Sequence, residues 1–273
     1  MPTLKIDYDR CSGDGACVRV CPAKLYVMGD DGFPRTVEGA ESSCIACGHC
    51  LAACPEGAIG VGRWTAADCP PATPLDLPEP KAVDRLLHSR RSVRAYAPKP
   101  LSREEIAELL HAARAAPTAV NRRAVRWIAF TERTSVADVA RLCAGWLGNV
   151  MEQAEDEGRR AFARFFLERW QEGEDLICRG APNLVLAHAP SDQAHMAQDA
   201  AIALTHLDLA AQARGLGTCW AGLVTSAASE FPELAAYLEL PEGHAVYGGL
   251  MLGRPALRYH RLPPRPDLPV RWR

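Results

Sequence analysis

The chain has 273 residues, a formal net charge of −2 and 48% hydrophobic residues, so it can build at least one large core. The near-neutral charge gives no reason to expect nucleic acid or an anionic membrane as a partner. No apolar run approaches the roughly 20 residues of a membrane span, and the opening MPTLKIDYDR lacks the apolar core of a secretory signal. We therefore expect a cytoplasmic protein, in a compartment where disulfides are rare.

Seven of the eleven cysteines fall within residues 11–54, and this clustering favours metal or cluster ligation. Residues 44–55, CIACGHCLAACP, have the ferredoxin spacing in which three thiolates bind one iron–sulfur cluster and the fourth binds its neighbour. Residues 11–22, CSGDGACVRVCP, repeat the run with Asp14 in place of a cysteine. In this arrangement the last cysteine of each run binds the cluster of the other run. The spacing therefore predicts a [4Fe-4S] cluster on Cys21, Cys44, Cys47 and Cys50, and a [4Fe-4S] or [3Fe-4S] cluster on Cys11, Cys17 and Cys54.

Asp14 leaves alternatives open for the second cluster. A carboxylate is a harder ligand than a thiolate and suits iron less well in a sulfur cage. Asp14 could bind the fourth iron of a four-iron cluster, or that iron site could stay empty so that a three-iron cluster forms. Asp14 could also be a turn residue that binds no iron. Structural zinc usually takes two separated pairs of ligands, so two interleaved runs fit paired clusters better. Residues 1–62 resemble the two-cluster bacterial ferredoxins.

Residues 64–80, WTAADCPPATPLDLPEP, contain five prolines and predict a semi-rigid spacer between domains at 1–63 and 81–273. Ser102 and Glu105 form a predicted capping box. In the second domain we expect helices at 81–89, 104–116, over most of 133–174, at 198–214 and near 229–239, and strands at 125–131, 183–189, 217–223 and 245–253. Because strands and helices mix without a regular βαβ repeat, the expected fold class is α+β.

A basic turn, HSRRSVRAY at 88–96, gathers Arg90, Arg91, Ser92 and Arg94, whose guanidinium and hydroxyl groups suit phosphate oxygens. Alone, it would be a solvated charged turn. Further patterns follow in order: A-P-T-x-x-N, G-L-G-T-C-W-A-G, L-P-E-G, and a final G-R-P with R-L-P-P-R-P. Together they make residues 81–273 resemble the FMN-binding nitroreductase family, and the order ferredoxin then nitroreductase resembles a fused subgroup of it.

The resemblance implies a mixed central sheet flanked by helices, in homodimers that hold FMN at the subunit interface. Residues 198–214 would form a central dimer helix. By matching motifs, the FMN phosphate and ribityl chain would bind Arg90, Arg91, Ser92 and Arg94. Arg261 and Arg265 are candidates for a second contact to the phosphate. Asn121 would bond the flavin ring, in a pocket shaped by Pro117 and Thr118. The backbone of Trp220, Ala221, Gly222 and Leu223 would face the reactive N5 edge.

We expect an iron–sulfur flavoprotein oxidoreductase that passes electrons from a low-potential donor, such as ferredoxin or NAD(P)H, through the clusters to FMN. The acceptor would be a small unsaturated molecule such as a nitroaromatic or a quinone. The alternatives are an electron-transfer protein without its own small substrate and an oxidative FMN enzyme. Flat acceptors stack on aromatic rings, which makes Trp146, Phe162, Phe165, Phe166 and Trp170 candidates for the substrate wall. Cys143, Cys178 and Cys219 are expected to be buried thiols.

Overall fold

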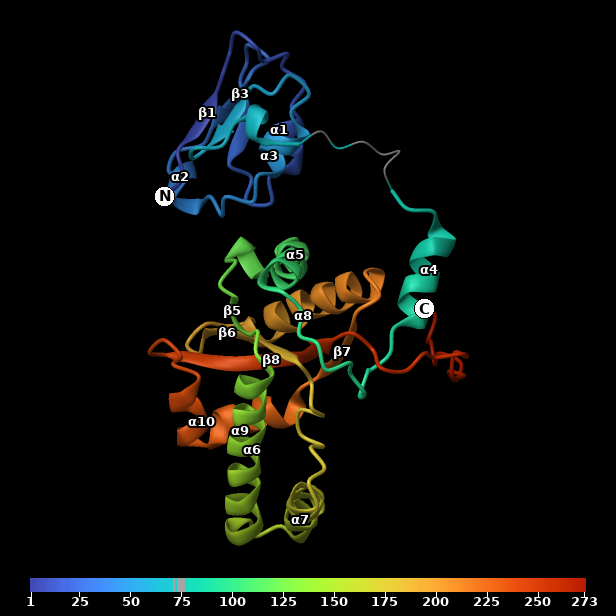
Figure 1. Ribbon diagram of the computed structural model, residues 1–273. Coiled ribbons are helices and arrows are strands. Elements are labelled where there is room, and N and C mark those ends of the chain that lie inside the picture. Colours follow the sequence, from blue (N-terminus) through green and yellow to red (C-terminus); the bar gives the residue numbers. More distant parts are fainter. Residues whose placement is uncertain (71, 73–76) are drawn as a thin grey trace. The chain divides into compact units, whose positions relative to one another are not determined.

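The computed structural model describes residues 1–70, 72 and 77–273 (Figure 1). It divides the chain into two compact units, Met1–Leu77 with Thr118–Arg123, and Pro78–Pro117 with Ala124–Arg273. The proline-rich spacer lies partly outside the described residues, and the domain boundaries drawn from the sequence stay a prediction. Among the described residues, no helix has both the length and the apolar character needed to cross a membrane.

The first unit repeats one small motif twice, as the two cysteine runs predict. It contains β1 (Leu4–Ile6), α1 (Ala16–Val20), β2 (Tyr26–Met28), β3 (Pro34–Thr36), α2 (Ala40–Ser43), α3 (His49–Ala53), β4 (Ile59–Val61) and the 3-10 helix η1 (Ala66–Asp68). Strand β1 pairs antiparallel with β4, and β2 with β3. Helices α1 and α3 each follow a left-handed glycine, Gly15 at φ 68° and Gly48 at φ 74°, and each ends on a cysteine, Cys21 and Cys54. Glycine adopts this backbone conformation without the steric cost of a side chain.

The second unit is built on a four-stranded sheet in the order β5-β6-β8-β7, with every neighbouring pair antiparallel. Its strands are β5 (Arg126–Phe130), β6 (Asn183–Pro190), β7 (Gly217–Trp220) and β8 (His244–Gly253). A parallel bridge between Ser92 and Thr218 adds a second pairing direction at the β7 edge. The α+β class predicted from the sequence is confirmed.

Helices cover both faces of this sheet (Figure 1). On one side lie α5 (Arg103–Ala113) and α8 (Met196–Ala213), and on the other lie α6 (Arg133–Gln153), α9 (Gly222–Glu230) and α10 (Pro232–Tyr237), with α7 (Glu157–Gln171) packed on α6. Helix α4 (Pro80–Ser89) precedes the basic turn. Strand β6 is buried on both faces: Leu184 and Leu186 join the core with α6, while Val185 and Ala187 join the core with α8. This burial explains its unbroken apolar run.

Some element boundaries differ from the sequence expectation for local reasons. The expected strand at 217–223 stops at Trp220, because Ala221 turns the chain and Gly222 starts α9. The helix expected near 229–239 is the end of α9 followed by α10, since Pro232 lacks the N–H needed to continue a helix. The single helical region at 133–174 is two helices, and the Asp156 side chain caps the second.

Candidate redox site

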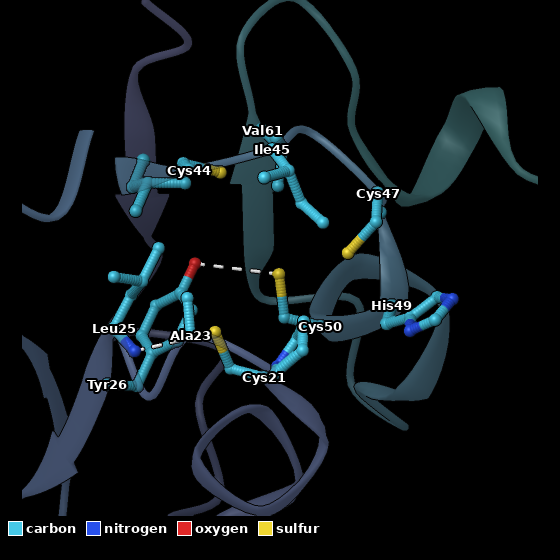
Figure 2. Close-up of a pocket in the computed structure, with 13 residues that line it drawn as sticks. Cys21, Ala23, Leu25, Tyr26, Cys44, Ile45, Cys47, His49, Cys50 and Val61 are labelled. Carbon is cyan, nitrogen blue, oxygen red and sulfur yellow. Dashed lines mark hydrogen bonds between the residues drawn. The ribbon is translucent and has the colours of Figure 1, made fainter. Parts of the chain in front are cut away.

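Four cysteines from both runs surround one hollow in the first unit (Figure 2). They are Cys21, Cys44, Cys47 and Cys50, the set predicted to hold one cluster. The hollow contains about 350 Å³ of space free of protein atoms, part of it open to solvent. Figure 2 shows the sulfur atoms turned toward this shared space. The structure thus brings Cys21, at the end of α1, to the run that begins at Cys44.

Two polar groups lie within hydrogen-bonding distance of sulfurs in this hollow. The backbone N–H of Leu25 donates to Sγ of Cys21 at 3.4 Å, and the hydroxyl of Tyr26 lies 3.6 Å from Sγ of Cys50. Burial raises the pKa of the Cys50 thiol, a cost that a bound metal offsets because it holds the thiolate form. Four thiols around one hollow, two of them with hydrogen-bonding groups at their sulfurs, fit the ligand set of an iron–sulfur cluster.

The second predicted ligand group lies around the start of α1 and the end of α3. Burial raises the pKa of the Cys17 thiol, and the nearby charges of Asp14 and Cys11 raise it further. Sγ of Cys54 accepts a hydrogen bond from Ala58 N at 3.3 Å. Ligation by this group stays a prediction.

The Asp14 carboxylate closes its own turn in this structure. It accepts from Ala16 N at 2.6 Å and from the Ser12 hydroxyl at 3.3 Å. This is the geometry of the unligated turn residue, one of the three alternatives for Asp14.

In the described part of the chain, no three His, Cys, Asp or Glu side chains form a group suited to one metal ion.

In the second unit, the predicted phosphate turn follows α4 and is anchored to β7. The Val93 N–H donates to Thr218 O at 2.8 Å, and Ser92 bridges to Thr218. A Cβ on Gly217 would lie 2.6 Å from Cγ2 of Val93, so the close approach of turn and strand requires glycine there. The turn is therefore fixed in position by backbone pairing and packing.

The arginines of the turn have contrasting surroundings. Arg90 Nη1 lies 3.5 Å from Oδ2 of Asp208, a buried acid on α8 that also accepts the Thr218 hydroxyl. Nε of Arg91 is buried and has no hydrogen-bond partner among the described residues, while its Nη1 donates to Arg90 O at 2.6 Å. A buried donor without an acceptor costs free energy. An anionic group at this turn, such as the phosphate implied by the motifs, would supply that acceptor. Arg94 is exposed.

The segment predicted to face a flavin lies where β7 gives way to α9. Ala221 is buried and its N–H donates to Gly249 O at 2.9 Å. Gly222 begins α9, is exposed, and faces open space on its Cβ side. The first N–H groups of a helix lack intrahelical acceptors, so Gly222 and Leu223 have backbone donors at an accessible position next to the half-exposed Trp220.

Asn121, predicted to contact the flavin ring, bonds residues of the first unit. Thr118–Arg123 cluster with the first unit, whereas Pro117 belongs to the second. The Asn121 amide donates to Ile45 O at 2.9 Å and Ala46 O at 3.0 Å, and accepts from Arg123 Nε at 3.1 Å. Its amide is thus engaged by the loop between Cys44 and Cys47. The flavin roles of Pro117, Thr118 and Asn121 stay predictions.

The C-terminal tail starts beside the basic turn. Arg254 pairs with Glu105 at 2.5 Å, and the Tyr259 hydroxyl donates to Ser92 O at 3.5 Å. Arg261 and Arg265 lie further along the tail and are exposed. Neither the ion pair of Arg254 nor the role of Asp208 was predicted from the sequence, since the partners of both residues are brought together only by the fold.

The aromatic group proposed as a substrate wall is divided. Trp146 is buried and donates to Glu230 at 3.1 Å. Phe166 and Trp170 pack against the core, whereas Phe162 and Phe165 are exposed. The three scattered thiols, Cys143, Cys178 and Cys219, are buried as predicted, and burial raises the pKa of Cys143 to about 12.

The first unit gathers cysteines as an iron–sulfur protein does, and the second is an α+β domain with helices on both faces of its sheet. Residues 87–254 match the nitroreductase family and residues 3–55 match the 4Fe-4S dicluster domain. The chain belongs to the nitroreductase family and has a 4Fe-4S dicluster domain ahead of it.

Similar proteins agree with this assignment. The FMN reductase [NAD(P)H] of Bacillus subtilis is 28% identical over 190 residues, 68% of this chain and 70% of that protein. The CR(VI) reductase of Pseudomonas sp. is 29% identical over 195 residues, 69% of this chain and 71% of that protein. A ferredoxin of Thermococcus kodakarensis is 40% identical over 57 residues, 20% of this chain and 86% of that protein. A nitroreductase with bound FMN from Bacteroides fragilis superposes with a TM-score of 0.57 at 25% identity, covering 69% of this chain and 97% of that one.

Proposed function

We propose that the protein is an FMN-dependent oxidoreductase that receives electrons at two iron–sulfur clusters and delivers them through FMN to a small unsaturated acceptor. The observation that carries the proposal is the hollow lined by Cys21, Cys44, Cys47 and Cys50 in a chain of the nitroreductase family. The FMN named for the structurally similar Bacteroides fragilis protein supports the choice of flavin. When bound, FMN exchanges both single electrons and electron pairs, so it links clusters to two-electron chemistry.

The residues of the second unit would have distinct tasks. The basic turn of Arg90, Arg91, Ser92 and Arg94 would bind the phosphate, and the buried Nε of Arg91 would gain an acceptor. The N-terminal amides of α9 would donate to the flavin's reactive edge from Gly222 and Leu223. Arg261 or Arg265 would add a second contact to the phosphate. Small acceptors of nitroaromatic or quinone type would then lie over the flavin, where donors stabilise developing negative charge.

The assembly and the electron donor belong to the same proposal. We propose a cytoplasmic homodimer with α8 at its centre; in the single chain, α8 buries Leu204 and Leu207 and leaves Ile202 and Thr205 exposed. The electron donor would be a ferredoxin or NAD(P)H, the second of which is named for the Bacillus subtilis relative.

The test is anaerobic purification or reconstitution followed by stopped-flow spectroscopy. We expect flavin and iron–sulfur absorbance in one protein, reduction of the clusters by reduced ferredoxin or of the flavin by the hydride donor NAD(P)H, and reoxidation by a nitroaromatic or a quinone. Protein without flavin absorbance would contradict the proposal. Reoxidation only by another protein would instead favour an electron-transfer partner, and flavin reduction by a substrate would favour an oxidative enzyme.

A further inference from the structure

We propose that Tyr26 tunes the reduction potential of the cluster bound by Cys21, Cys44, Cys47 and Cys50. Its hydroxyl donates a hydrogen bond to the Cys50 sulfur and thereby stabilises the reduced cluster. The inference rests on the proposed function, because it requires that the hollow bind a cluster.

The protonation state of a cluster ligand fixes the direction of this hydrogen bond. The Tyr26 oxygen lies 3.6 Å from Sγ of Cys50, and Figure 2 shows the hydroxyl directed into the hollow. Either atom could donate between a thiol and a phenol. A cluster ligand is a thiolate, however, which has no proton to give, so the phenol must be the donor.

Tyr26 is held firmly in place. It is only 2% exposed, and as the first residue of β2 it pairs with Thr36 of β3. Its neighbour Leu25 donates its backbone N–H to Cys21, so two consecutive residues donate to two different sulfurs of the same hollow. A rigid side chain loses little entropy when it makes such a bond.

The sign of the effect follows from electrostatics. Reduction adds one electron, and hence one negative charge, to the cluster. A hydrogen-bond donor stabilises the more negative state more, and the low dielectric of a buried site strengthens this preference. The electron would come from a one-electron donor such as reduced ferredoxin and would leave to the flavin. The hydroxyl proton stays on Tyr26 throughout.

The effect should be confined to one of the two clusters. Tyr26 bonds a sulfur of the first ligand group, whereas in the second group Cys54 receives its hydrogen bond from Ala58 N. A purely structural role for Tyr26 would alter iron retention or the whole unit, but it would not shift a single potential.

The experiment is an EPR-monitored redox titration of the full chain, reconstituted anaerobically, with Tyr26→Phe and with Tyr8→Phe as the matched control. Tyr8 lies in the same unit, but its hydroxyl donates to Pro34 O at 3.2 Å rather than to a sulfur. We expect Tyr26→Phe to retain its iron and to shift one midpoint potential to a more negative value, with the other unchanged. Tyr8→Phe should shift neither.

A second substitution keeps the proposal testable if Tyr26→Phe loses iron. Fluorotyrosine placed at position 26 retains the hydroxyl and the shape but donates more strongly, so the same midpoint should become more positive. An unchanged potential in either iron-replete variant, or an equal shift of both clusters, would overturn the role of Tyr26. If the unsubstituted protein binds no cluster at all, the proposed function itself fails.

Discussion

Asp208 joins three elements of the second unit at one carboxylate. It lies on α8, pairs with Arg90 of the basic turn, and accepts the hydroxyl of Thr218 on β7. The arginines and serine of the turn were recognisable from the sequence because they lie together in the chain. Asp208 was not, because its partners lie about 120 residues before it and 10 residues after it, and only the fold brings them together.

The first prediction concerns the acidity of this residue. Burial raises the pKa of Asp208, although Thr218 and Arg90 act in the opposite direction. A carboxyl whose pKa is higher in the folded state binds more protons when folded, so its contribution to stability is lost as the pH rises. Relative to Asp208→Asn, the wild type should gain stability as the pH falls from neutral toward 4. Thermal melts of the wild type and Asp208→Asn, measured at a series of pH values between neutral and 4, test the expected gain.

The exposed Asp192→Asn serves as the control for that series. Asp192 lies in the same unit and is exposed, so its replacement shows the effect of losing one carboxylate without losing a buried group. If Asp208→Asn changes the pH dependence of melting no more than Asp192→Asn does, the role assigned to burial is contradicted. Acid loss of clusters would affect the wild type and both variants alike, because the substituted residues lie outside the unit with the predicted cluster ligands.

The second prediction uses the close approach at Gly217. An alanine Cβ there would overlap the Val93 side chain, and overpacking of this kind costs about 1–3 kcal/mol. The overlap would also displace the turn that holds Arg90 and Arg91, so FMN should bind more weakly. Chemical denaturation and flavin fluorescence titration measure the two effects.

Gly148→Ala is the matched control, and it should change stability in the opposite direction. Gly148 lies inside α6 and a Cβ there meets no atom within 4 Å, so alanine should stabilise the helix by roughly 0.5–1 kcal/mol. If Gly217→Ala is as stable as the wild type, the packing of the basic turn against β7 does not require glycine at position 217.

At the scale of elements, the start of α5 illustrates what local sequence determines. The Ser102 hydroxyl accepts from Glu105 N at 3.2 Å, and the Glu105 carboxylate accepts from Ser102 N at 2.9 Å. This capping box was predicted because both partners lie within four residues. Its second function was not predictable: the same Glu105 also pairs with Arg254 from the far end of the chain.

The third prediction follows from this cap. Ser102→Ala removes the acceptor for a helix N–H and should lower the free energy of unfolding by about 1 kcal/mol. Ser229→Ala is the control, because Ser229 is exposed near the end of α9 and its hydroxyl bonds only within that helix; it should change stability by less than about 0.5 kcal/mol. Equal effects from both substitutions in urea unfolding would exclude a specific contribution from the cap.

The elements that the sequence placed less well depend on tertiary contacts. The β6 strand was clear from its apolar run, and the end of α8 from Gly215, which adopts φ 70°. The chain from 217 to 239 was divided wrongly, because its residues suit either a strand or a helix. The backbone bond from Ala221 N to Gly249 O ends the strand and lets α9 begin, and no local pattern announces that contact.

At the scale of the whole molecule, each unit has its own core. Tyr26, Leu51 and Val61 belong to the core of the first unit, and the cores of the second unit draw on other residues throughout. The two cysteine runs predicted the first unit well, because ligand spacing is a local property. The arrangement around Asn121 was not predictable, since the family motif that contains it says nothing of the carbonyls of Ile45 and Ala46.

The last prediction separates the two redox centres. Cys50→Ser should lose the iron of one cluster and keep that of the other, because Cys50 lines the hollow of the first ligand group and a serine oxygen suits iron less well than a thiolate. Most of the flavin should be retained, since the predicted FMN residues at 90–94 and 220–223 lie in the separately packed second unit, whereas Thr118 and Asn121 belong to the first. Cys69→Ser is the control: Cys69 is a half-buried thiol outside both ligand groups, with its sulfur 3.8 Å from Thr65 O, and should keep all iron. Iron and flavin analysis of both variants, with EPR of each, measures this.

Equal loss of iron in the two variants would contradict the ligand assignment, whereas loss of flavin from Cys50→Ser alone would show that the second unit depends on the cluster for its fold.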